Sequence, residues 1–92
     1  MEEIKDKVRE FVLDAAQRKG LETVTDDESL TENGVVDSLG VFRLVSFLED
    51  DFGIRIADED IVSENFRSVT AIESFVAERL LKKANPLIPE TL

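Results

Sequence analysis

The chain of 92 residues contains no cysteine and no histidine. Without cysteine it can form neither a disulfide nor a thiolate metal site. Without histidine it lacks the usual general base near neutral pH and the commonest metal ligand, so a serine here would be a poor catalytic nucleophile. No apolar run approaches the roughly 18 residues of a membrane span, and the acidic start is unlike a signal peptide. We expect a cytoplasmic protein with no metal site, no membrane span and no catalytic activity.

Positive charge is also scarce. The chain has 11 basic and 21 acidic residues, which gives a net charge of −10. A charge of this sign repels the phosphate backbone of nucleic acids and anionic membrane surfaces. Basic protein surfaces are therefore the expected partners, and nucleic acid is not. The length suffices for one small domain with a modest core.

Apolar residues recur at spacings of three and four in three segments, which predicts three amphipathic helices. The first ends before Gly20, and its core face consists of Ile4, Val8, Phe11, Val12 and Ala15. The second runs from about Ser38 to Phe52, with a core face at Val41, Leu44, Val45, Leu48 and Phe52. The last begins near Ser68 or Thr70 and buries Ile72, Phe75, Val76 and Leu80.

The segments between these helices carry turn signals. A long acidic loop from Leu21 to Asp37 ends with the turn dipeptide Asn33-Gly34, and its apolar residues should pin it to the core. After Gly53 the sequence predicts a short extended piece and a brief third helix capped by Asp58, from which Ile61 and Val62 return to the core.

The start and the end of the last helix also carry signals. Thr70 and Glu73 fit a capping box, and Asn85-Pro86 ends the helix. The fold class is therefore all-α, with four helices of which the third is short. We expect residues 1–84 to form the domain and residues 85–92 to form a flexible tail.

Ser38 lies where the acidic loop meets the second helix, and its role admits several interpretations. It could simply cap the helix, because its oxygen can accept a hydrogen bond from the first turn. A hydrolase elbow would need glycine at position 36, where the chain has valine. A calcium loop with Gly34 in sixth place would put Gly40 where a bidentate glutamate is required. A covalent attachment site fits better, since a phosphate ester at a helix start meets the positive end of the dipole.

The outer side of the second helix, beside Ser38, combines large apolar residues with charged ones. It presents Leu39, Phe42, Arg43, Ser46, Glu49 and Asp50, so two large apolar side chains should be exposed there. Such a patch suggests a contact surface. Arg43 would either face a partner or pair with Glu49 or Asp50 on its own helix.

Three segments of the chain together form a recognisable pattern: G-V-V-D-S-L-G at 34–40, L-E-D-D-F-G-I-R-I-A-D-E-D-I at 48–61 and S-V-T-A-I at 68–72. In these residues the sequence resembles the acyl carrier protein family and its peptidyl and aminoacyl relatives. The similarity covers about residues 1–84.

This resemblance implies a four-helix acyl-carrier-like bundle whose Ser38 carries 4'-phosphopantetheine, added from coenzyme A by a phosphopantetheinyl transferase. An acyl- or aminoacyl-loading ligase would then charge the terminal thiol as a thioester, and a downstream synthase or transferase would use it. Asp37 and Leu39 match motif residues that help the transferase recognise the site. The rival interpretation is a small acidic interaction module that is never modified. In either case we expect a monomer.

Departures from the fatty acid type indicate a specialised carrier. That type usually has acidic residues at the second and fifth positions after the serine, whereas this chain has Gly40 and Arg43. The segment G-V-V-D-S also looks more like peptidyl or aminoacyl carriers than like G-A-D-S. We therefore expect a free-standing carrier in fatty acid, polyketide, peptide or aminoacyl metabolism, with recognition by Asp37, Leu39, Phe42, Arg43, Glu49 and Asp50.

Overall fold

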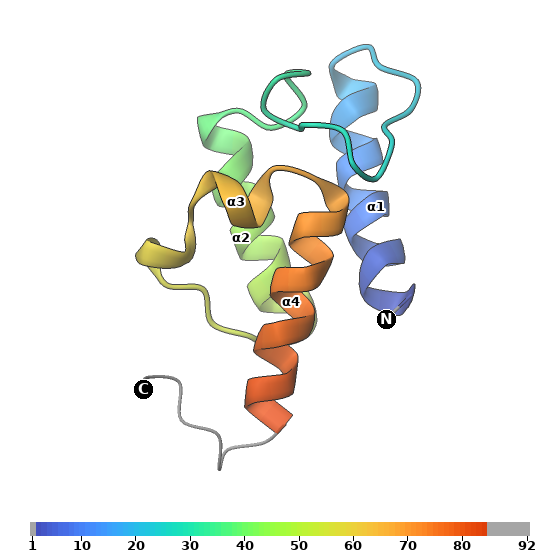
Figure 1. The fold of residues 1–92 in the computed structure, drawn as a ribbon. Helices are drawn as coiled ribbons and strands as arrows, with labels where there is room; N and C mark the ends of the chain where they lie inside the picture. Colours follow the sequence, from blue (N-terminus) through green and yellow to red (C-terminus); the bar gives the residue numbers. More distant parts are fainter. Residues whose placement is uncertain (1, 85–92) are drawn as a thin grey trace.

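The computed structural model describes residues 2–84. This part of the chain consists of helices that are connected by loops. The elements are α1 (Glu2–Arg18), α2 (Ser38–Phe52), the 3-10 turn η1 (Asp58–Asp60), α3 (Ser63–Phe66) and α4 (Val69–Ala84). Three of these helices are long, and the short α3 packs against α4 (Figure 1). The predicted all-α fold with four helices and a short third helix is confirmed. The predicted tail at 85–92 lies outside the described residues.

The core forms because α4 packs against each of the other three helices. From α1 it takes one residue per turn, at Ile4, Val8, Val12 and Ala16. From α2 and α4 it takes Leu44, Val45, Leu48, Val69, Ile72, Phe75 and Val76. The predicted core residues Phe11, Ala15, Val41, Phe52 and Leu80 are only half-buried at its edge. Each predicted apolar face therefore points toward the core, but it includes residues that are only half-buried.

The long loop between α1 and α2 is fixed to the rest of the protein, as its apolar residues predicted. Leu30 is fully buried, and its backbone N–H donates to the carbonyl of Arg67 at 2.8 Å. Earlier in the loop, the carbonyl of Asp26 accepts from the N–H of Thr70 at 3.0 Å, and the Asp26 carboxylate pairs with Arg9 at 2.7 Å. These contacts join the loop to α1 and α4, so the loop presents the start of α2 from a supported position.

Between α2 and α3 the sequence assignments were wrong in detail. Asp58 does not cap a helix, because the carboxylate of Asp60 accepts from the N–H of Ala57 and closes η1 instead. Val62 is 45% exposed rather than buried. The alternating residues Ile54 and Ile56 fill this part of the core, as an extended strand-like segment with one face inward requires.

The start of α4 lies at Ser68, the first of the two predicted positions, but the predicted capping box does not form. The hydroxyl of Ser68 accepts from the N–H of Ala71 at 3.1 Å, so Ser68 is the cap. Thr70 already lies in the first turn, and Glu73 forms an ion pair with Lys5 at 3.7 Å. The Thr70–Glu73 capping box is therefore wrong, because the helix begins two residues earlier than such a box requires.

Candidate functional site

Asp37, and not Ser38, caps helix α2. Its carboxylate accepts the N–H of Gly40 at 2.7 Å and pairs with the ammonium of Lys19 at 3.0 Å. The hydrogen bond from Gly40 is the main cause that lowers the pKa of Asp37 from its usual value, and Lys19 lowers it further. A β-carbon at position 40 would lie 3.2 Å from the Asp37 oxygen, so Gly40 permits the close approach of the cap. The interpretation of Ser38 as a simple cap is wrong.

Ser38 is the first residue of α2 and is exposed. Its hydroxyl makes no hydrogen bond with any residue in the described range 2–84. Unpaired N–H groups and the positive end of the helix dipole lie at this end of α2 and favour an anionic substituent. An exposed, unpartnered hydroxyl beside a cap that another residue supplies fits a phosphate ester at this position.

The enzyme and metal interpretations of this serine find no support in the geometry. Ser38 follows a loop and not a strand, and within residues 2–84 only glycines have positive φ, so no strained nucleophile elbow is present. Among the same residues no group of three or more acidic side chains is arranged to hold a metal ion.

The predicted contact surface lies beside Ser38. Leu39 is 60% exposed and Phe42 is 64% exposed. Arg43 is exposed and forms no ion pair within the described part of the chain, so the suggested pairing with Glu49 or Asp50 does not occur. Asp50 is exposed as well.

Glu49 is placed differently from its neighbours on the outer side of α2. It is half-buried, and its carboxylate accepts the N–H of Ile56 at 2.9 Å. The extended segment after Gly53 passes close to α2 there, and its backbone N–H needs an acceptor. Sequence spacing alone could not reveal this bond, because it joins residues on two different elements.

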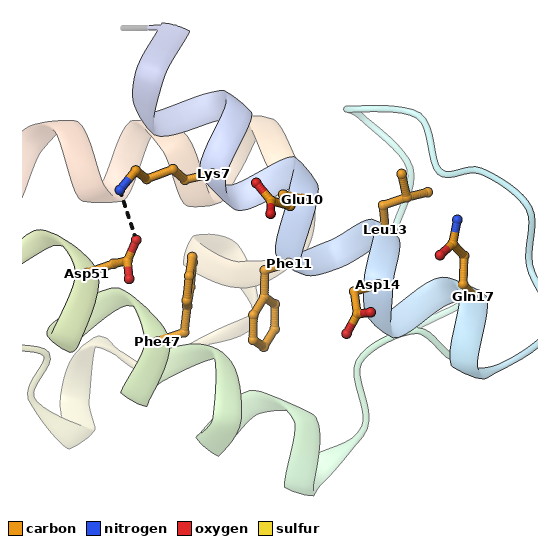
Figure 2. Close-up of a pocket in the computed structure, with 8 residues that line it drawn as sticks. All are labelled: Lys7, Glu10, Phe11, Leu13, Asp14, Gln17, Phe47 and Asp51. Carbon is orange, nitrogen blue, oxygen red and sulfur yellow. Dashed lines mark hydrogen bonds and ion pairs between the residues drawn. The ribbon is translucent and has the colours of Figure 1, made fainter.

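Two adjoining hollows along α1 and α2 were not predicted. The one at the start of α2 has a volume of about 280 Å³ and is lined by residues that include Asp37, Leu39, Gly40 and Arg43, but not by Ser38. The second has a volume of about 660 Å³ and lies further along the two helices (Figure 2). Phe11 and Asp14 line both hollows, so we name them together the α1/α2 groove.

Comparison with known proteins decides between the carrier and the unmodified interaction module. A family model described as a phosphopantetheine attachment site matches residues 6–76. The chain belongs to this family. It is 37% identical over 73 residues to the D-alanyl carrier protein of Streptococcus uberis, which covers 77% of this chain and 92% of the relative. The D-alanyl carrier protein of Streptococcus pyogenes is 33% identical over the same length, with the same coverage.

A solved structure agrees with this assignment. The crystal structure of an acyl carrier protein from Thermotoga maritima matches with a TM-score of 0.64 and 36% identity, covering 88% of this chain and 94% of that chain. The carrier therefore holds acyl or aminoacyl intermediates as thioesters on covalently attached 4'-phosphopantetheine. Carrier proteins are generally not catalytic, and they work with phosphopantetheinyl transferases and loading ligases. No helix within residues 2–84 has the length and apolar character needed to span a membrane.

Proposed function

We propose that Ser38 is the residue that carries the phosphopantetheine arm. The observation that carries this proposal is the division of roles at the start of α2. Asp37 supplies the cap, which leaves the Ser38 hydroxyl exposed and without a partner. In the transfer, the Ser38 oxygen bonds to the pantetheine-side phosphorus of coenzyme A, adenosine 3',5'-bisphosphate leaves, and the hydroxyl proton passes to a base of the transferase.

The residues around Ser38 present it to other enzymes and do no chemistry of their own. Lys19 ties the Asp37 cap to the end of α1, which fixes the first turn of α2. Leu39, Phe42 and Arg43 form the exposed surface that an approaching enzyme meets. When bound, the arm supplies the thiol that a chain without cysteine lacks. This chain is in our proposal a carrier without catalytic activity.

We further propose that the cargo is an amino acid. The relatives named above are D-alanyl carrier proteins, and Gly40 and Arg43 depart from the acidic pattern of fatty acid carriers. The partners would then be a phosphopantetheinyl transferase, an aminoacyl-loading ligase and a downstream transferase. The proposed carrier is a cytoplasmic monomer whose domain comprises residues 1–84.

Mass spectrometry of the intact protein tests the attachment site. The wild type and two variants, Ser38→Ala and Ser46→Ala, are incubated with a broad-specificity phosphopantetheinyl transferase and coenzyme A. Ser46 is the matched control because it is another exposed serine on α2. We expect the wild type and Ser46→Ala to gain one arm and Ser38→Ala to gain none. Labelling of Ser38→Ala would refute the site, and no gain by the wild type would favour the unmodified interaction module.

A further inference from the structure

An ion pair joins the two ends of the acidic loop between α1 and α2. Lys19 lies just before this loop and Asp37 is its last residue, and the Lys19 ammonium lies 3.0 Å from the Asp37 carboxylate. The end of α1 and the start of α2 lie at the same end of the fold (Figure 1). The pair therefore brings a positive charge of α1 to the residue that directly precedes Ser38.

The position of Lys19 is set by the last turn of α1. Its backbone N–H donates to the carbonyl of Ala16 at 3.0 Å, and the N–H of Leu21 donates to the same carbonyl at 2.9 Å. Ala16 is fully buried, and Gly20 supplies the positive φ of 86° that favours such a helix end. The negative end of the α1 dipole also favours a cation here. The helix end therefore places the Lys19 side chain within reach of Asp37, independently of the ion pair.

Lys19 is the cation that balances the charge of Asp37. The Asp37 carboxylate accepts from the N–H of Gly40 with one oxygen and from the Lys19 ammonium with the other. After the hydrogen bond from Gly40, Lys19 is the main cause that lowers the pKa of Asp37, and no other charged side chain of residues 2–84 contributes. The loop offers no substitute, because residues 21–37 include six acidic and no basic residues.

Attachment of the arm would add a second anion beside this carboxylate. The Ser38 hydroxyl is neutral, whereas the phosphodiester that replaces it carries one negative charge. Consecutive Cα atoms are about 3.8 Å apart, and the N–H groups of the first turn attract both the Asp37 carboxylate and a phosphate on Ser38. The two anions therefore lie within the Debye length, which is about 10 Å at ~0.1 M salt, and repel each other. Without a counter-charge, the modification would destabilise the first turn that Asp37 caps.

We propose that Lys19 is the counter-charge of the attachment site, which balances Asp37 so that a second anion can be added to the adjacent serine and held there. Lys19 is in this role a positioning residue, because it acts through Asp37. This inference rests on Ser38 as the attachment residue and extends the site to a residue of α1. A purely structural tie would stabilise the modified and the unmodified carrier equally, whereas a counter-charge stabilises the modified carrier more.

The test compares the stability of each variant with and without the arm. A broad-specificity phosphopantetheinyl transferase modifies the protein, intact mass confirms complete conversion, and circular dichroism gives Tm for both forms. Lys19→Gln removes the charge but keeps a hydrogen-bond donor, and Lys19→Arg keeps the charge. Arg18→Gln is the matched control, because it removes the same charge from the neighbouring residue, whose partner is Asp14 of α1 at 3.1 Å and not Asp37.

The quantity of interest is the change in Tm on attachment of the arm. We expect this change to be more negative for Lys19→Gln than for the wild type by roughly 1–8 °C, which is the range for one exposed ion pair in a domain of this size. Lys19→Arg and Arg18→Gln should match the wild type. In about 1 M salt the difference between Lys19→Gln and the wild type should largely disappear, because the Debye length falls to about 3 Å.

Several outcomes would overturn the proposal. These are an equal change in Tm for Lys19→Gln and the wild type, the same extra loss in Arg18→Gln, or an extra loss in Lys19→Arg as large as that in Lys19→Gln. If Lys19→Gln alone gained no arm while Lys19→Arg was fully modified, the charge at position 19 would be required at the transfer step itself, in agreement with the proposal. A wild type that gains no mass would instead overturn the attachment site on which the proposal rests.

Discussion

Two leucines on α2 offer a sharp test of the packing. Leu48 is fully buried, whereas Leu39 is 60% exposed beside Ser38. Changing either leucine to alanine removes the same atoms from the same helix, so the change in helix propensity is similar in both variants. The difference between them therefore reports burial alone.

The magnitudes follow from these two environments. Leu48→Ala loses the transfer free energy of its buried atoms and leaves a cavity, which together cost about 2–5 kcal/mol. Leu39→Ala removes a side chain that is mostly in water already, so the loss is about 1 kcal/mol or less. In a domain of this size each kcal/mol lowers Tm by roughly 4–8 °C. We expect a fall of roughly 10 °C or more for Leu48→Ala and of a few degrees for Leu39→Ala.

Thermal unfolding followed by circular dichroism measures both variants against the wild type. Urea unfolding gives an independent value, because a change in midpoint at constant slope reports a change in stability. Equal destabilisation by the two variants, or a larger effect of Leu39→Ala, would show that the faces of α2 are assigned wrongly.

Three further predictions concern the caps and the charged surface. Ser68→Ala should lower the free energy of unfolding, measured with urea, by about 0.5–2 kcal/mol because it removes the α4 cap, and Thr70→Ala should lower it by less. The reverse order would support the Thr70–Glu73 capping box instead. The depressed pKa of Asp37 means that its carboxylate stabilises the fold above its unfolded pKa of about 3.9 and that this contribution is lost as pH falls through the lower folded pKa. Asp37→Asn should therefore lose less stability than the wild type on acidification, as measured by Tm against pH, and identical profiles would contradict the assignment. Arg43→Glu should improve acceptance by fatty acid synthesis enzymes with basic carrier-binding surfaces and slow loading by the native ligase, whereas Arg55→Glu should do neither; equal loading rates for both variants would exclude a selective role for Arg43.

The long helices could be predicted because their apolar residues repeat with the period of the structure they form. On α2 the spacing placed Leu44 and Leu48 in the core and left Leu39 and Phe42 outside, as the structure has them. The Asn33-Gly34 turn and the start of α2 at Ser38 were equally local signals. In each case the physical cause lies within a few residues of the chain.

The features that could not be predicted depend on contacts between distant residues. Ser68 and Thr70 are both acceptable caps by composition, and the choice is set by the loop, whose Asp26 carbonyl takes the N–H of Thr70. The sequence pattern predicts that Glu49 is a surface residue, whereas in the structure the segment that carries Ile56 lies against it. The α1/α2 groove likewise exists only once the two helices have a relative position.

The start of α2 shows how one neighbour can free another for function. Asp37 and Ser38 are both residues that cap helices well, and a serine that caps has its oxygen engaged by a backbone N–H. Here the aspartate takes that role, and Lys19 holds its carboxylate in place from the end of α1. Ser38 is therefore the first residue of the helix and not its cap, and its hydroxyl is exposed and has no partner in the described chain. An attachment residue needs a rigid first turn and an available hydroxyl. Asp37 provides the first because it caps the helix, and Ser38 provides the second because it does not.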